Sequence, residues 1–285
     1  MSYELVVAAP AEPSWRALRA AVGLPDVRMV PAEPRDEAWP ESGIGLCRAH
    51  RSTRTTELGW QAGKLTIVIR ALASPDDCDL ALRVAEVAAG LCGADTVEAD
   101  YFGAIEVGEL RPLHTADWMQ EQAVSGTRVL AKLIRDGKGP MQMPGPNRSC
   151  FVGARLLAEL EAAGSPETLS DQVLATMRRV QWGVPDDFRD AGVFISEGSD
   201  AGHGRKTRFA SWLPDANLVI PQVDYVALRA TEGEVVMVPF AAVAALAGSH
   251  GTLLDEVQLL VSAIGDEPWK TVIARARPLA ASPRR

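Results

Sequence analysis

The chain has 285 residues, of which 47% are hydrophobic and 23% are charged, and its formal net charge is −8. This composition is typical of a soluble globular protein, and it excludes a disordered chain, a collagen and a disulfide-rich mini-protein. The length predicts about two domains. Residues 1–150 and residues 151–285 each carry a net charge of −4, so neither half has the basic excess that nucleic-acid binding requires.

Elements of the first part can be read from strand-like runs and helix-capping residues. Ser14 is placed to cap a helix that Gly23 ends. Ser74 and Pro75 mark the start of a second helix, with Gly93 at its end, because these residue types favour helix termini. The predicted strands are 3–8, 27–30, 44–50, 55–60, 64–71 and 96–100. This order predicts a split βαβ, ferredoxin-like sheet domain with extra strands over residues 1–113.

Helices dominate the chain after His114. Thr115 is placed to cap a long helix through Ile134, which residues 136–140 close, and a Pro/Gly-rich linker follows at 141–147. The remaining predicted elements are helices at 151–163 and 169–180, strands at 193–196, 218–220, 225–230 and 235–238, and short helices at 240–246 and 269–276. We therefore predict an α+β protein with a second domain over 114–285, in which helices precede antiparallel strands and short helices.

The cysteines and the N-terminal residues indicate the cellular compartment in which the protein is expected. Cys47, Cys78, Cys92 and Cys150 include no Cys-x-x-Cys pair, which favours reduced thiols in the cytoplasm, while a two-disulfide secreted protein is the alternative. Residues 1–7 read as a first strand and not as a signal peptide.

One long stretch of the chain contains no charged residue. It runs from Val235 to Leu254 and has about the length of a membrane span. Pro239 and the Gly248–Gly251 segment interrupt it, so we predict a buried strand followed by a short helix and no membrane partner.

A glycine-rich segment at 198–207 follows the predicted strand 193–196 and ends in Lys206-Thr207. Such a loop can bind phosphate through backbone N–H groups, which makes a nucleotide- or phosphate-using enzyme one alternative. A Walker loop needs glycine directly before lysine, and here Arg205 intervenes. A surface loop is the expected structure, and its basic residues Arg205, Lys206 and Arg208 are candidates for contact with a partner.

Glu232 and Glu234 form a Glu-x-Glu pair before an apolar run, which resembles the motif of ADP-ribosyltransferases. In that family an arginine and a Ser-Thr-Ser strand precede the pair. Arg229 is too close to it, and Arg51-Ser52-Thr53 is too far upstream. A polar hairpin turn is the plainer prediction.

The remaining candidate groups are histidines and tryptophans. The four histidines show no metal-binding spacing, so we predict no metal site and no cofactor. Trp212 lies near Arg208, a composition typical of protein interfaces, although a tryptophan that closes a hydrophobic core would give the same pattern.

Three segments, Val223–Val226, Val238–Phe240 and Val243–Gly248, form a predicted strand, turn, strand and short helix. In this they resemble bacterial immunity proteins of polymorphic-toxin and contact-dependent secretion systems. The resemblance implies stoichiometric binding and neutralisation of a toxin, without catalysis or cofactor. The predicted partner-binding residues are Arg205, Lys206, Arg208, Trp212, Asp186, Asp187 and Asp190. A scaffolding subunit of a bacterial assembly is a third alternative.

Overall fold

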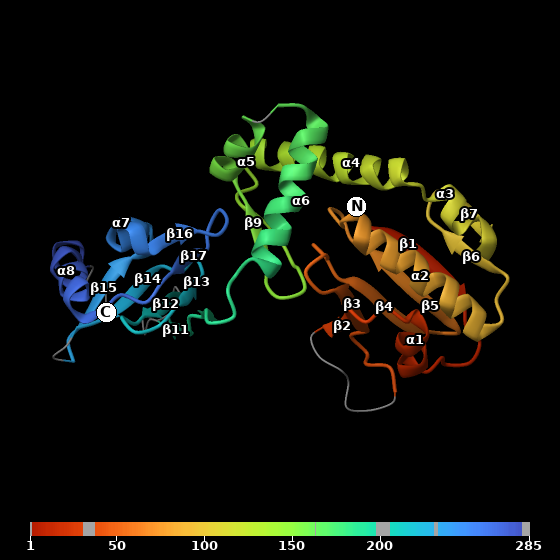
Figure 1. Ribbon diagram of the computed structural model, residues 1–285, viewed down its shortest axis with the longest axis horizontal. Coiled ribbons are helices and arrows are strands. Elements are labelled where there is room, and N and C mark those ends of the chain that lie inside the picture. The colour runs from red at the N-terminus through yellow and green to blue at the C-terminus, as the bar shows by residue number, and fades with distance from the viewer. Residues whose placement is uncertain (1, 31–37, 163, 198–205, 231–232, 281–285) are drawn as a thin grey trace. The chain divides into compact units, whose positions relative to one another are not determined.

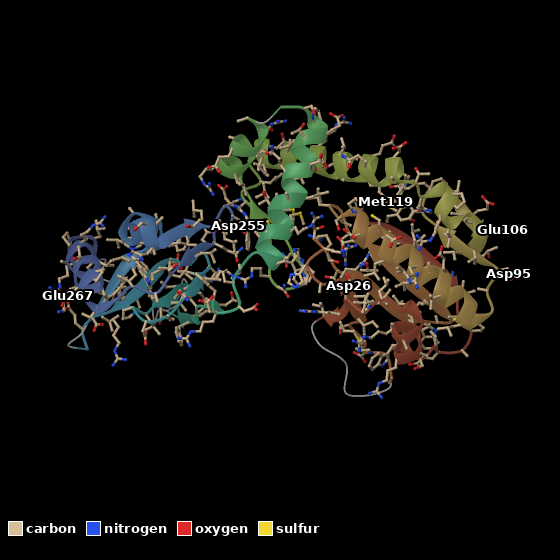
Figure 2. The ribbon with its side chains drawn as sticks, in the orientation of Figure 1. Asp26, Asp95, Glu106, Met119, Asp255 and Glu267 are labelled. Carbon is tan, nitrogen blue, oxygen red and sulfur yellow. The ribbon has the colours of Figure 1, made fainter. Side chains whose placement is uncertain are left out.

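The computed structural model describes residues 2–30, 38–162, 164–197, 206–230 and 233–280. The chain forms two compact units, Met1–Gly183 and Val184–Arg285, and Figure 1 shows the elements of each. Both units combine helices with sheets, which confirms the α+β class. Acidic side chains lie on the surface of both units, among them Asp95 and Glu106 in the first and Glu267 in the second (Figure 2).

The first unit contains a seven-stranded sheet in which all neighbouring strands are antiparallel, in the order β2-β3-β4-β5-β1-β6-β7. Helix α2 (Pro75–Cys92) connects β5 to β6, and β1 lies between these two strands. The ferredoxin-like arrangement in full stays a prediction. The strands are β1 (Tyr3–Ala8), β2 (Val27–Val30), β3 (Ile44–Arg48), β4 (Thr56–Gln61), β5 (Lys64–Ile69), β6 (Thr96–Ala99) and β7 (Gly103–Glu106).

One face of this sheet forms the hydrophobic core together with α1 (Trp15–Val22) and α2. Alternate residues of a strand point to opposite faces, and on β1 and β5 the buried side chains therefore fall at every second position, such as Leu5, Leu65 and Ile67.

The helix ends follow the predicted capping residues. The Ser14 and Ser74 hydroxyls accept backbone hydrogen bonds at the starts of α1 and α2, and Asp77 completes a capping box with Ser74. Gly23 and Gly93 end these helices with φ of 66° and 68°, values that glycine adopts without strain.

The boundary between the units lies later than the predicted division at residue 113. The helices after His114 pack within the first unit because α6 is bonded to a loop near its sheet. Trp182 Nε1 donates to the Ser52 carbonyl at 2.7 Å, and Arg178 Nε donates to the Arg51 carbonyl at 3.1 Å. The elements concerned are α3 (Leu110–Leu113), α4 (Ala116–Arg135), β8 (Met141–Met143), β9 (Cys150–Val152), α5 (Ala154–Glu161) and α6 (Pro166–Trp182). The helix predicted from 151 starts only at Ala154, because β9 pairs with β8.

The second unit has two four-stranded sheets, in the orders β10-β13-β17-β16 and β11-β12-β14-β15. The predicted hairpin of β14 with β15 is confirmed. Among the described residues, no helix is long and apolar enough to cross a membrane. The elements are β10 (Arg189–Asp190), β11 (Val193–Glu197), β12 (Lys206–Trp212), β13 (Leu218–Ile220), β14 (Tyr225–Arg229), β15 (Val235–Pro239), α7 (Phe240–Ala247), β16 (Gly251–Leu253), β17 (Leu259–Val261) and α8 (Asp266–Ala276).

Candidate functional site

The partner-binding residues predicted from the sequence all fall in the second unit. Lys206 and Arg208 are exposed on β12, while Arg205 lies outside the described residues. The backbone N–H of Arg208 donates to the Asp224 carboxylate at 2.8 Å, which fixes the strand at this point. The three predicted acidic residues, Asp186, Asp187 and Asp190, are exposed in and before β10.

Trp212 must be removed from that set. Its side chain is fully buried and packs edge-to-face against Trp269, with ring centroids 5.2 Å apart. The physical reason is strand alternation, because Ala210 and Trp212 point into the core and Phe209 points to the opposite face. A partner cannot contact this ring in the folded protein.

The two enzyme motifs gain no support from the described residues. A Walker loop leads into a helix, but here strand β12 begins at Lys206, and residues 198–205 lie outside the described part. Glu232 also lies outside it, and Glu234 pairs with Arg277 at 2.9 Å on the surface. Within the described ranges, no group of three or more His, Cys, Asp or Glu residues could hold a metal ion.

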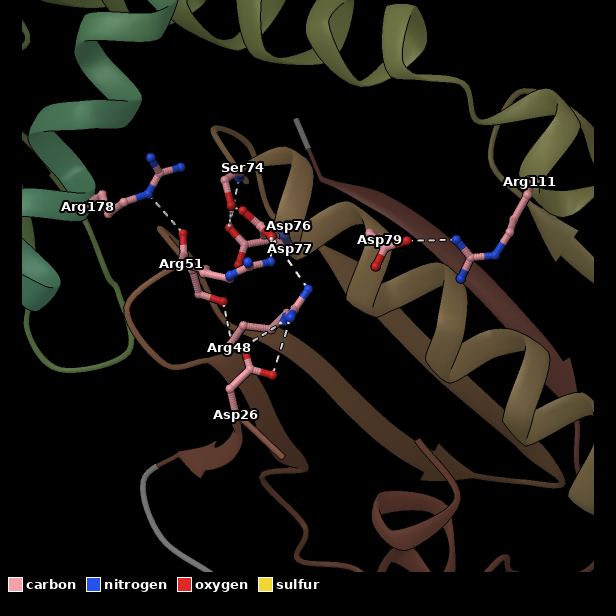
Figure 3. A network of polar contacts seen from close by, with 10 residues as sticks. Asp26, Arg48, Arg51, Ser74, Asp76, Asp77, Asp79, Arg111 and Arg178 are labelled. Atoms are coloured by element: carbon pink, nitrogen blue, oxygen red, sulfur yellow. Dashed lines mark hydrogen bonds and ion pairs between the residues drawn. The ribbon is translucent and has the colours of Figure 1, made fainter. Parts of the chain in front are cut away.

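A buried carboxylate organises the polar network of the first unit (Figure 3). Asp77 Oδ2 accepts hydrogen bonds from the backbone N–H groups of Thr53, Arg54 and Ser74 at 2.8–3.1 Å. The hydroxyls of Thr53 and Ser74 also donate to it, at 3.0 and 2.8 Å. Burial raises the pKa of Asp77 above its ordinary value, and the hydrogen bonds oppose that shift. The carboxylate thus ties the 52–54 loop to the start of α2.

Ion pairs continue this network toward the surface, as Figure 3 shows. Arg48 pairs with Asp26 at 3.1 Å and with Asp76 at 3.5 Å, and Arg51 pairs with Asp76 at 3.0 Å. Each of these charges therefore has a partner, and the cluster connects strands with the start of α2. We assign it a structural role.

A second cluster in the first unit consists of five rings in contact with one another: Tyr3, Tyr101, Phe102, His114 and Trp118. Tyr3 is central, with ring centroids 6.2 Å from Tyr101, 5.0 Å from Trp118 and 5.4 Å from His114. His114 lies 4.7 Å from Trp118 and 5.3 Å from Phe102. Most of these pairs are edge-to-face, an arrangement that aromatic quadrupoles favour. The cluster joins β1, the β6–β7 turn and the start of α4.

The base of this aromatic cluster is polar and buried. The Tyr3 hydroxyl lies 2.5 Å from His114 Nε2, and His114 Nδ1 lies 2.7 Å from the Leu110 carbonyl oxygen. A carbonyl only accepts, so Nδ1 carries the proton, Nε2 accepts, and the Tyr3 hydroxyl donates. Burial lowers the pKa of His114 and raises the pKa of Tyr3. Both groups are therefore held neutral, and each ring has one fixed orientation.

The top of the cluster is exposed. Tyr101 and Phe102 occupy the β6–β7 turn, and their exposed fractions are 77% and 41%. The turn is anchored to β1, since the backbone N–H of Glu4 donates to Asp100 Oδ2 at 2.8 Å and the backbone N–H of Asp100 donates to the Glu4 carbonyl at 3.1 Å. Tyr101 has φ of 67°, a conformation that is costly for a side chain other than Gly, Asn or Asp. Strain of this kind is enriched at functional sites.

A pocket of about 40 Å³ adjoins the exposed ring of Tyr101. It lies between α4 and the segment that follows β5, and Tyr101 and Trp118 form part of its wall together with Leu72 and Val129. A Cβ at Gly126 would lie 3.3 Å from the Leu72 side chain, so the glycine permits the close approach of α4 to that segment.

Reasoning from the sequence did not find this aromatic cluster. His114 and Trp118 are four positions apart, but His114 lies outside the helix that carries Trp118, and Tyr3 is 111 residues from His114. The adjacent aromatic pair Tyr101-Phe102 in a turn was the available signal. A comparison with protein-family models, with curated proteins and with solved structures finds no match to this chain.

Proposed function

We propose that the protein is a protein-binding module whose contact surface is the aromatic cluster of the first unit. The observation that carries this proposal is a pair of exposed rings, Tyr101 and Phe102, held on a base of buried ones. Tryptophan and tyrosine dominate the binding energy of protein interfaces. Rings that are already fixed lose little conformational entropy on association, which favours affinity.

The proposed partner is a protein toxin, which the chain neutralises by stoichiometric binding in the cytoplasm. Two observations support this choice. The net charge of −8 favours association with a basic partner by electrostatic steering. The segments Val223–Val226, Val238–Phe240 and Val243–Gly248 overlap the start of β14, the junction of β15 with α7, and the rest of α7, in the order that the resemblance to immunity proteins implies.

The test is co-expression with the protein encoded by the adjacent gene, followed by titration calorimetry on the purified pair. We expect a 1:1 complex and protection of the host cell from the toxicity of that protein. Tyr101→Asn should weaken binding at least about tenfold, as loss of one hot-spot side chain does. Asparagine tolerates positive φ, so this variant keeps the turn.

Val235→Ser is the matched control, since Val235 is also an exposed apolar residue but lies in the second unit. It should bind as the wild type does. A complex that Tyr101→Asn and Phe102→Ala leave unchanged would reject the proposed surface. A cell that the chain fails to protect, with no complex formed, would reject toxin neutralisation.

A further inference from the structure

Strand β11 exposes three consecutive apolar side chains at the edge of a sheet. Val193, Phe194 and Ile195 have exposed fractions of 39%, 63% and 61%. Among the described strands, β11 pairs only with β12. Within the described part of the chain, its other side presents backbone N–H and C=O groups that no strand pairs, beside apolar side chains, an edge that soluble proteins usually shorten, charge or cover.

The three side chains are divided between the two faces of the sheet, with Phe194 on one face and Val193 and Ile195 on the other. Phe194 pairs with Phe209, Phe209 with Tyr225 and Tyr225 with Pro239, so these residues form a row across all four strands. The rings of Phe209 and Tyr225 are stacked, with centroids 6.1 Å apart. The row lies on the face opposite the core, and its Phe194 end is at the open edge.

Val193 and Ile195 point to the other face, the face of the core. Val193 pairs with Ala210, which is buried, and Ile195 pairs with Arg208, which is exposed. A single neighbouring strand would cover Val193, Phe194 and Ile195 together and would also satisfy the backbone groups. An extended segment is the occupant that this edge fits.

We propose that the occupant is β11 of a second copy of this chain, paired antiparallel about a two-fold axis at Phe194. In this register Phe194 lies opposite Phe194 of the second copy, and Val193 lies opposite Ile195 of the second copy. Every exposed apolar side chain of the strand then meets an apolar one on the same face. The two aromatic rows join into one row across eight strands.

Size and charge agree with this register. Gly192 lies opposite Ser196 of the second copy, so small residues flank the two phenylalanine rings. Residues 192–196 carry no charge, so no two like charges lie directly opposite each other in this register. A two-fold dimer uses the same patch on both chains, which this self-complementary strand provides. The inference does not rest on the proposed toxin binding.

The test is the mass of the full-length chain by light scattering coupled to size exclusion. The wild type should have a mass of about 61 kDa, twice that of one 30.5 kDa chain. Phe194→Lys and Phe194→Glu should each be monomeric, because like charges then meet at the axis. Their equimolar mixture should return to the dimer mass, because Phe194 faces itself only in this register. Val235→Lys adds the same charge at the opposite edge, on β15, and should stay dimeric.

Phe194→Cys gives a second readout that does not depend on the charged variants folding. Residues directly opposite in an antiparallel pair lie within reach of a disulfide. Oxidation should therefore produce a covalent dimer, and Val235→Cys should not. A wild-type chain that stays monomeric at every concentration overturns the proposal. So does a dimer that both charged variants retain, or a charged mixture that remains monomeric. Rejection of the dimer would not affect the separate proposal that the protein binds a partner through the surface at Tyr101.

Discussion

The Tyr3 hydroxyl donates a hydrogen bond to Nε2 of His114, at an O–N distance of 2.5 Å. The bond connects β1 with the residue that ends α3, across 111 positions of the chain. Both side chains are buried, so water cannot replace either partner. This pair fixes the base of the aromatic cluster and thereby the rings above it.

Tyr3→Phe should lower the free energy of unfolding by about 1–3 kcal/mol, because it leaves His114 Nε2 buried without a donor while the ring packing is kept. Urea unfolding followed by circular dichroism measures the change. Tyr101→Phe, which removes an exposed hydroxyl, is the control and should change little. Equal stability of Tyr3→Phe and the wild type would show that the hydrogen bond has no energetic role.

The same pair predicts a dependence of stability on pH. The pKa of His114 is lower in the folded chain than its ordinary value of 6.5, so the unfolded chain binds the additional proton. Its contribution to stability is therefore complete above pH 6.5 and is lost as the pH falls below that value, by up to about 1.4 kcal/mol per pH unit. Unfolding free energies measured between pH 5 and pH 8 should show this slope, and His114→Gln should reduce it. An identical slope in His114→Gln would assign the effect to other groups.

Asp77→Ala should be among the most destabilising single substitutions in the first unit. It leaves three backbone N–H groups and the Ser74 hydroxyl without their acceptor, while the Thr53 hydroxyl keeps the Leu72 carbonyl, and the loss should cost about 3 kcal/mol or more. Asp76→Ala, at the neighbouring position, breaks only partly exposed ion pairs and should cost less than about 1 kcal/mol. Similar losses for the two variants in thermal unfolding would contradict the central role of the buried carboxylate.

Tyr101→Asn should leave stability within about 0.5 kcal/mol of the wild type, because the exposed ring contributes little burial and asparagine is suited to its positive φ. Tyr101→Gly should be equally well tolerated. Differential scanning calorimetry checks both. A large drop in melting temperature would mean that the ring supports the fold, and loss of binding could then not be assigned to the surface.

The sequence predicted those features that depend on neighbouring residues. Ser14, Ser74 and Thr115 cap helices as expected, and their hydroxyls accept the predicted backbone hydrogen bonds. Cap preferences are local, so one sequence suffices to read them. The hairpin of β14 with β15 is local for the same reason.

Features that depend on distant residues could not be read in this way. The placement of α6 in the first unit depends on Trp182 and Ser52, which are 130 residues apart. Trp212 lies close to Arg208 in the sequence, yet strand alternation and Trp269 place its ring in the core. The aromatic cluster likewise required the folded chain, because Tyr3, Tyr101 and His114 come from separate elements.

The most direct measurement is the affinity of the chain for the protein encoded by the adjacent gene, compared between the wild type, Tyr101→Asn and Val235→Ser. The proposed surface predicts that Tyr101→Asn binds at least about tenfold more weakly, whereas Val235→Ser binds as the wild type does. Equal affinity of all three chains would contradict binding through the aromatic cluster.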